Sequence, residues 1–284
     1  MISSPLRSFF RIAVYFAWIF VGMPLQAMAL LLRSSFANRF PQIFHSVCIK
    51  TMALRIEVHG TQIKKGPVLF VANHSSYLDI SVLGALIRGA FVAKSEVATW
   101  PIYGWCAKLS RTVFVNRRAR HAMTQSVELK RRLQEGDNLI LFPEGTSGDG
   151  NRVLPFRSSL FSAAEIEIDG KKLLVQPVTV AYTKLDGIPL GRHLRPLFTW
   201  YGDMDLFSHI WTMFGLGKLT VTVEFHPPVT IDQFRSRKEM CRYCQDRVAT
   251  GLAAALTGRP QQMPELPAHP KLPAPAAFAL PAPS

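Results

Sequence analysis

The chain has 284 residues, of which 48% are hydrophobic and 18% charged, so it can build a full-sized core and lacks the composition of a disordered protein. Lys and Arg number 33 against 19 Asp and Glu, and the formal charge of +14 predicts a polyanionic partner. The four cysteines are too few for a disulfide-stapled secreted fold and favour a reducing compartment. Because Cys241 and Cys244 have no second pair, we interpret them as two small residues on one helix face, not as a zinc or redox site.

The first predicted element is strongly apolar. Ile12–Leu32 contains 21 residues without a charge and is flanked by arginines on both sides. A helix of that length is able to cross about 30 Å of hydrocarbon. Gly22, Pro24 and Gln26 interrupt the run, so a bent helix inserted into one leaflet is an equal alternative to a full span. A secretory signal has a shorter apolar region of about 7–15 residues, so the segment is expected to stay in the mature protein.

The next segment, Arg39–Ala53, has apolar residues at intervals of three and four and predicts an amphipathic helix. Residues 1–66 hold eight Lys or Arg and one acid, Glu57, which places half of the excess charge beside the lipid-like segment. Membrane lipid is therefore favoured over nucleic acid as the partner, and no nucleic-acid motif is present. We expect residues 1–58 to form a membrane-associated helical module, with the rest of the chain on the cytoplasmic side of the membrane.

Apolar runs of strand length then alternate with helix-like segments. The predicted strands are Val68–Ala72, Phe91–Ala93, Thr112–Val115, Asn138–Phe142, Leu174–Ala181 and Leu219–Phe225. The predicted helices are Tyr77–Ile87, Pro101–Leu109, Ala119–Gln134 and Ser158–Ile166, followed by a closing helix over Thr230–Leu256 capped by Thr230 or Asp232. Short, wholly apolar strands between helices predict an α/β domain over residues 59–259, with a mixed, mostly parallel sheet flanked by helices. From residue 260 to 284, eight of 25 residues are proline, which predicts a disordered Pro/Ala-rich tail.

His74 is the residue with the most suggestive setting for acid–base chemistry. It follows the first of these strands directly, and Asp79 comes five residues later. On one regular helix the two side chains would diverge, so they share a site only if His74 lies in the turn before the helix. An aspartate bonded to one imidazole nitrogen leaves the other free to accept a proton. Taken alone, the pattern is weak, and it favours a solvent-facing histidine and a helix-capping aspartate over a catalytic pair.

Two later strand ends add functional groups at the edge where His74 is expected. Arg117 follows the strand that ends at Val115, and Glu144, Gly145 and Thr146 form a turn after the next one. The carboxyl ends of parallel strands are the usual location of a ligand crevice. A guanidinium fork there suits a phosphate or a carboxylate.

Four blocks in order resemble the glycerolipid acyltransferases of the PlsC type. They are Asn73-His74 through Asp79, Phe114-Val115-Asn116-Arg117, Phe142-Pro143-Glu144-Gly145-Thr146, and Val175-Gln176-Pro177-Val178. The resemblance covers about residues 60–230 and implies that His74 is a general base oriented by Asp79. It further implies that Arg117, the Glu144-Gly145-Thr146 turn and Lys94 hold the acceptor headgroup. The region Ile12–Ala53 is similar to the two-helix membrane module of some bacterial members.

The sequence departs from the family pattern at two positions. Asn116 stands where relatives usually have Asp, and Ser147 stands where they usually have Arg after the Glu-Gly-Thr turn. If that Arg holds a phosphate in relatives, another cation replaces it here or the acceptor lacks the phosphate. The candidate cations nearby in sequence are Lys94, Arg118, Arg152 and Arg157.

The resemblance predicts a membrane-associated O-acyltransferase that moves a fatty acyl group from a thioester to the free hydroxyl of a lysolipid. The primary prediction for the acceptor is 1-acylglycerol 3-phosphate, which gives phosphatidic acid, and the alternative is lyso-ornithine lipid. Acyl carrier protein or coenzyme A carries the donor, and no cofactor or metal is expected. Two further alternatives are a Ser-His-Asp hydrolase, although the GxSxG elbow is missing from the sequence, and a non-catalytic lipid-binding protein.

Overall fold

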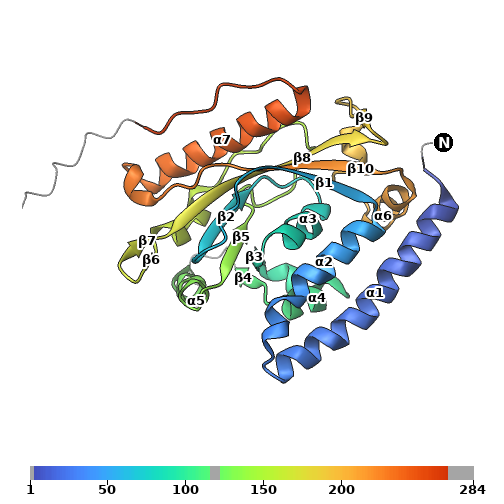
Figure 1. Cartoon of the computed structure of the whole chain (residues 1–284), viewed down its shortest axis with the longest axis horizontal. Coiled ribbons are helices and arrows are strands. Elements are labelled where there is room, and N and C mark those ends of the chain that lie inside the picture. The colour runs from blue at the N-terminus through green and yellow to red at the C-terminus, as the bar shows by residue number, and fades with distance from the viewer. Residues whose placement is uncertain (1–2, 116–121, 268–284) are drawn as a thin grey trace, which may run out of the picture.

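A mixed sheet of eight strands forms the centre of the protein (Figure 1). The computed structural model describes residues 3–115 and 122–267. The strand order is β1-β10-β8-β2-β5-β3-β4, and β9 pairs with the end of β8. The bounds are β1 Leu54–Gly60, β2 Val68–Ala72, β3 Gly89–Lys94, β4 Val113–Val115, β5 Asn138–Leu141, β8 Leu174–Leu185, β9 Ile188–Pro189 and β10 Leu219–Phe225, with a separate hairpin of β6 Glu167–Ile168 and β7 Lys171–Lys172.

Strands β8, β2, β5, β3 and β4 run parallel to one another, whereas β10 is antiparallel to β8. The register places Val71 of β2 opposite Leu141 of β5 and Pro177 of β8. Because these strands end at one edge, the segments that follow β2 and β5 lie side by side. The predicted mixed, mostly parallel sheet is confirmed.

Strand β2 is fully buried because both faces of the sheet are covered. Val68, Phe70 and Ala72 belong to the core on one face, and Leu69 and Val71 belong to the core on the other. This two-sided burial explains why the strand is apolar at every position, without the alternation of a half-exposed strand.

Helices cover both faces. The first face carries α2 (Phe40–Thr51), α3 (Leu78–Leu86) and α6 (Leu206–Gly215), and the second carries α5 (Ala122–Gln134), α7 (Arg237–Thr257) and the 3₁₀ helix η4 (Ser158–Glu165). Helix α4 (Tyr103–Leu109) lies near α1 (Pro5–Leu31) and the turn η2 (Ser95–Thr99). Figure 1 shows α7 above the sheet and α2 and α3 below it.

Several predicted boundaries are corrected. The closing helix begins at Arg237 with Ser236 as its N-cap, because Thr230 caps a separate 3₁₀ turn over Ile231–Gln233. The segment predicted as a helix over 158–166 is the 3₁₀ helix η4. Strand β1 crosses the domain boundary expected after residue 58. Residues 260–267 have no helix or strand, and residues 268–284 of the predicted tail lie outside the described part.

Helix α1 is long and apolar enough to cross a membrane, with a mean hydropathy of 1.7 in its most apolar window. It begins at Pro5, earlier than the uncharged run, because Ser4 caps it and Pro5 suits the first helical position. The helix is tied to the rest of the protein near both ends. The Arg11 guanidinium donates to the Phe214 and Leu216 carbonyls at 3.0 and 2.8 Å, and the Gln26 amide donates to the Leu109 carbonyl at 3.0 Å.

Candidate active site

His74 lies in the turn between β2 and α3, as the contact with Asp79 requires. Its Nδ1 lies 2.9 Å from Oδ2 of Asp79, and Asp79 is fully buried in the first turn of α3. The Asp79 carboxylate therefore fixes the tautomer with the proton on Nδ1. No hydrogen bond in the described part of the chain involves Nε2 of His74, so this nitrogen is available as a base.

Asp79 accepts three further hydrogen bonds. The backbone N–H groups of Ser75 and Ser76 donate to its Oδ2 at 2.7 and 2.9 Å, and the Tyr182 hydroxyl donates to its Oδ1. Burial, followed by the nearby Asp79, raises the pKa of Tyr182 well above its ordinary value, so the hydroxyl keeps the proton that it donates. A buried carboxylate with four donors is fully satisfied and rigidly held.

Asn73 fixes the backbone just before His74. Its side-chain amide donates to the Val180 carbonyl at 2.9 Å and accepts from the Val180 N–H at 2.8 Å. The β2–β8 ladder ends at Ala72, and the Asn73 side chain then makes the next pair of hydrogen bonds to the β8 backbone. The turn that carries His74 is therefore anchored to the sheet.

The His74 ring stacks on Phe142, with ring centroids 4.1 Å apart and an angle of 19° between the planes. Phe142 stacks in turn on Phe91 of β3, with centroids 6.1 Å apart. The stack leaves the His74 side chain only 22% exposed, which limits the rotation of the ring.

Glu144 belongs to the same site through the His74 backbone. Its Oε1 accepts the His74 N–H at 3.0 Å, and its Oε2 has no hydrogen-bond partner within the described residues. Burial raises the pKa of Glu144 to about 8, so this carboxyl group is protonated over much of the neutral range. The following Gly145 has a φ of 68°, and its N–H donates to the Phe142 carbonyl, which closes a tight turn. Thr146, the last residue of the predicted turn, is exposed.

The remaining predicted site residues lie at the ends of neighbouring strands or outside the description. Lys94 ends β3, opposite Val115 of β4, and is half-buried. Arg117, Asn116 and Arg118 lie outside the described residues. The structure thus brings His74, Asp79 and Glu144 together and places Lys94 on the same edge of the sheet.

An apolar cavity of about 140 Å³ lies next to the His74 turn. Its wall includes Tyr77, Trp100, Trp200 and Leu206, together with Phe91 from the aromatic stack. Tyr15 of α1 and Phe44 of α2 line it as well, so the cavity extends between the site and the N-terminal helices. Its lining suits an alkyl chain.

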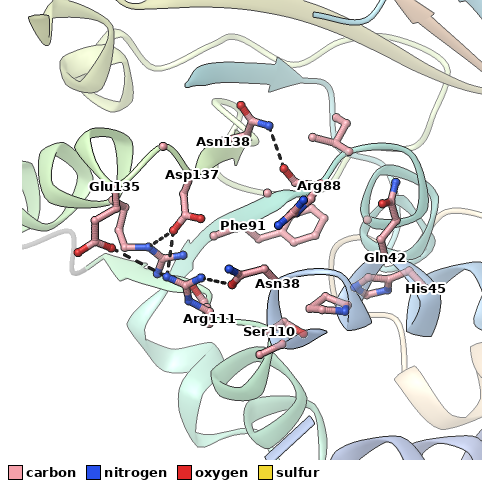
Figure 2. A pocket seen from close by; sticks show the side chains of 18 of the residues that line it. Asn38, Gln42, His45, Arg88, Phe91, Ser110, Arg111, Glu135, Asp137 and Asn138 are labelled. Carbon is pink, nitrogen blue, oxygen red and sulfur yellow. Dashed lines mark hydrogen bonds and ion pairs between the residues drawn. The ribbon is translucent and has the colours of Figure 1, made fainter. Parts of the chain in front are cut away.

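A second, polar pocket of about 350 Å³ opens where β3 and β5 begin, at the opposite end of these strands from His74. Figure 2 shows Arg111 and Asp137 pointing toward one another in its wall. Asp137 Oδ2 lies 2.7 Å from Nε of the buried Arg132 and 3.1 Å from the Arg111 guanidinium. The predicted site residues are not in its wall. The ion pairs of Arg111 and Arg132 with Asp137 fasten α5 and β5 to the α4–β4 turn.

Sequence reasoning missed Tyr182 and Trp200. Tyr182 follows Val178 and Val180 on one face of β8, so the two-residue period of a strand was the available signal for its burial. Trp200 lies in a loop, where no periodic pattern applies. The backbone N–H of Trp200 donates to the Ser75 carbonyl at 2.9 Å.

Comparisons with known proteins agree with this geometry. The model of the Acyltransferase family matches residues 55–181. The chain is 40% identical to the lyso-ornithine lipid O-acyltransferase of Brucella abortus (strain 2308), over 92% of this chain and 98% of that protein. It is 38% identical to the protein of the same name from Rhizobium meliloti (strain 1021), over 84% of this chain and 83% of that one. The crystal structure of PlsC, the 1-acyl-sn-glycerophosphate (LPA) acyltransferase of Thermotoga maritima, matches with a TM-score of 0.65 and 25% identity, over 91% of this chain and 96% of that chain.

Proposed function

Since this chain belongs to the Acyltransferase family and is an acyltransferase of lysolipids, we propose that its acceptor is a lyso-ornithine lipid. The observation that carries the proposal is the 40% identity to a lyso-ornithine lipid O-acyltransferase over 98% of that protein. Ser147, in place of the Arg that relatives usually have, agrees with an acceptor that lacks a phosphate monoester. The order of the two acceptors expected from the sequence is therefore reversed, and 1-acylglycerol 3-phosphate becomes the second candidate.

The proposed chemistry begins with the free Nε2 of His74. This nitrogen takes the proton of the acceptor hydroxyl while that oxygen attacks the carbonyl carbon of the thioester. The resulting tetrahedral intermediate collapses, the carbon–sulfur bond breaks, and the thiolate leaves with the proton from the imidazolium. Asp79 stabilises the imidazolium through Nδ1, at the observed 2.9 Å. General-base catalysis of this kind contributes roughly 10²–10⁴ in rate.

The other predicted residues have supporting roles in the proposal. Glu144 holds the His74 backbone, and Gly145 permits the tight turn that brings Glu144 under it. In the proposal Arg117, Thr146 and Lys94 bind the acceptor headgroup, and Lys94 does so from the end of β3. The apolar cavity at Tyr77 and Trp200 receives an acyl chain. The donor is a thioester of acyl carrier protein or coenzyme A, and the reaction needs no further cofactor.

Helix α1 supplies the proposed membrane contact. Its outer surface exposes large apolar side chains along the whole helix, among them Phe9, Phe10, Phe20 and Leu31. A row of this size on a protein surface marks a membrane or protein interaction site. In the proposal this face lies in the lipid, the acceptor reaches the apolar cavity from the membrane, and the catalytic domain remains on the cytoplasmic side.

An acceptor panel with the purified full-length protein tests this function. Lyso-ornithine lipid and lysophosphatidate are each supplied with an acyl-carrier-protein thioester and with an acyl-coenzyme A, and the products are identified by mass spectrometry. We expect a diacylated ornithine lipid, formed with a higher kcat/KM than phosphatidic acid. Robust turnover of lysophosphatidate without turnover of the ornithine acceptor would overturn the proposal in favour of the second candidate. The donor that supports the higher rate identifies the thioester.

A further inference from the structure

A charged groove of about 530 Å³ lies beside the His74 turn, and the proposed chemistry does not use it. Its wall consists of Asp149, Asn151, Arg152, Arg192 and Arg195. The first three residues follow the Glu144-Gly145-Thr146 turn in sequence, and the two others precede Trp200. Of these five residues, only Arg152 was among the candidate cations predicted from the sequence to replace the Arg that relatives have at position 147.

Backbone hydrogen bonds hold both walls of this groove against the turn that carries His74. The Gly148 N–H donates to the His74 carbonyl at 2.9 Å, and the Trp200 N–H donates to the Ser75 carbonyl at 2.9 Å. The Ser147 hydroxyl donates to the Trp200 carbonyl and so joins the two walls. The groove therefore adjoins the turn that carries His74, and a headgroup bound in it lies next to this turn.

The groove presents both signs of charge. Asp149 accepts from the backbone and side-chain nitrogens of Asn151 at 3.0 and 3.2 Å, and Asn151 accepts from the Arg195 guanidinium at 2.7 Å. The half-buried Arg195 also donates to a backbone carbonyl, and its Nε is buried without a hydrogen-bond partner in the described chain. Arg152 and Arg192 are exposed.

The three guanidinium groups keep their charge uncompensated at close range. Within residues 3–115 and 122–267, no carboxylate lies within the 4 Å of an ion pair from Arg152, Arg192 or Arg195. Burial and the neighbouring Arg192 lower the pKa of Arg195, and Asp149 opposes this effect. A bound anion would relieve the repulsion between the guanidinium groups.

We propose that this groove binds the headgroup of a zwitterionic amino-acid lysolipid, with the carboxylate on the arginines and the ammonium on Asp149. The inference rests on the proposed function and names the residues that select its acceptor. Ornithine acylated on one amino group keeps a carboxylate and a second amino group, so its charges match the two signs in the groove. A phosphate monoester could contact the arginines, but it carries no cation for Asp149, so the Asp149 contact is the one that separates the two acceptors.

The test compares three acceptors that differ only in the headgroup: lyso-ornithine lipid, its methyl ester, and the norvaline analogue that lacks the terminal amino group. We expect Asp149→Asn to lower kcat/KM about tenfold for lyso-ornithine lipid and to leave the norvaline analogue nearly unchanged. We expect the double variant Arg152→Ala, Arg192→Ala to lower kcat/KM about tenfold or more for the free acid and little for the methyl ester. The control is Arg235→Ala, an exposed arginine before α7, which should leave all three values unchanged.

Two negative outcomes are distinguishable. If the wild-type protein acylates lyso-ornithine lipid but each groove variant loses the same factor with all three acceptors, the headgroup site is wrong and the proposed function stands. If the wild-type protein fails to acylate lyso-ornithine lipid while it acylates lysophosphatidate, the proposed function is wrong and the headgroup assignment is overturned with it.

Discussion

The carboxylate of Asp79 divides its two oxygens between different partners. Oδ2 faces the His74 ring and two backbone N–H groups, whereas Oδ1 faces the Tyr182 hydroxyl. All the partners of Oδ2 therefore come from the turn between β2 and α3. The Tyr182 contact comes from the centre of the sheet and holds the carboxylate from β8.

Tyr182→Phe separates these two contributions. The variant removes one donor to Asp79 and leaves the backbone donors of Ser75 and Ser76 in place. We expect a loss of about 1.5–3 kcal/mol in unfolding free energy, the usual contribution of a hydrogen bond to a charged group. Acyl transfer should fall by less than about tenfold, since the His74 contact survives. Denaturant unfolding and steady-state kinetics check this, and a variant as inactive as Asp79→Ala would contradict it.

Glu144 predicts a pH dependence of stability. Burial raises the pKa of its carboxyl group from 4.5 to about 8 in the folded state, so the folded protein binds this proton more tightly than the unfolded chain does. The contribution to stability is complete below about pH 4.5 and is lost as the pH rises toward about 8. Unfolding in urea across this range should show a declining free energy that Glu144→Gln flattens. The exposed Glu265→Gln is the control and should leave the slope unchanged.

The sequence predicted the contact between His74 and Asp79, which lie close together in the chain, and missed the contact of Asp79 with the distant Tyr182. His74 and Asp79 belong to one strand-to-helix junction, so their contact required only that the helix begin after His74. Tyr182 lies 103 residues from Asp79, and its contact depends on the register of β8 against β2, which no local pattern reveals. The groove arginines Arg192 and Arg195 lie in a turn and a short 3₁₀ helix, where no periodic pattern indicates which side chains meet.

Helices α2 and α3 approach each other closely where Gly84 of α3 packs against the imidazole ring of His45 in α2. A Cβ atom added to Gly84 of α3 would overlap the side chain of His45 in α2. His45 is buried, and this burial lowers its pKa to about 4, so the ring packs as a neutral group. The φ of Gly84 is not in the left-handed region, so backbone conformation does not require a glycine here. The close packing against His45 does.

Gly84→Ala tests this packing. We expect the added methyl group to destabilise the protein by about 1–3 kcal/mol, the usual cost of overpacking a core. Gly191→Ala is the matched control, since no atom lies within 4 Å of its Cβ position. Thermal unfolding of both variants in detergent checks the difference. Equal transition temperatures would show that the two helices move apart at little cost.

The hydrogen bonds of α1 predict its topology. Arg7 and Arg11 donate to carbonyls at the end of α6, and Gln26 donates to the end of α4, so both halves of α1 are fastened along the catalytic domain. A helix held in this way lies at the membrane surface or within one leaflet. In sealed vesicles, a tag on residue 1 should be cut by protease from the side on which the catalytic domain is cut. Protection of the tag from that side would establish a full span instead.

Prediction of the strands succeeded where the apolar run was pronounced. The β2 and β10 bounds agree with the apolar runs at Val68–Ala72 and Leu219–Phe225. Strand β1 was missed because it is an edge strand with charged and exposed positions, which lacks the apolar run of a central strand. The start of α7 was misplaced because Thr230 forms a capping box, and only the structure shows that this box begins a single 3₁₀ turn and not the long helix.

At the scale of the whole molecule, the two edges of the parallel strands differ in chemistry. The carboxyl edge collects His74, Glu144 and Lys94 around the apolar cavity and the charged groove. The amino edge holds the polar pocket of Figure 2, where Asp137 and the buried Arg132 form an ion pair. This asymmetry follows from strand direction, and it places the proposed acyl transfer at one edge and structural ion pairs at the other.

Single-turnover acyl transfer by His74→Ala, measured with the acceptor and donor that the wild-type protein uses best, tests the proposed proton transfer most directly. The variant should keep its fold, because Asn73 anchors the turn through its own side chain. The rate should fall at least about 100-fold, the lower limit for loss of a general base, while the exposed His59→Ala retains the wild-type rate. A His74→Ala protein that keeps more than about a tenth of the wild-type rate would contradict the assignment of His74 as the base.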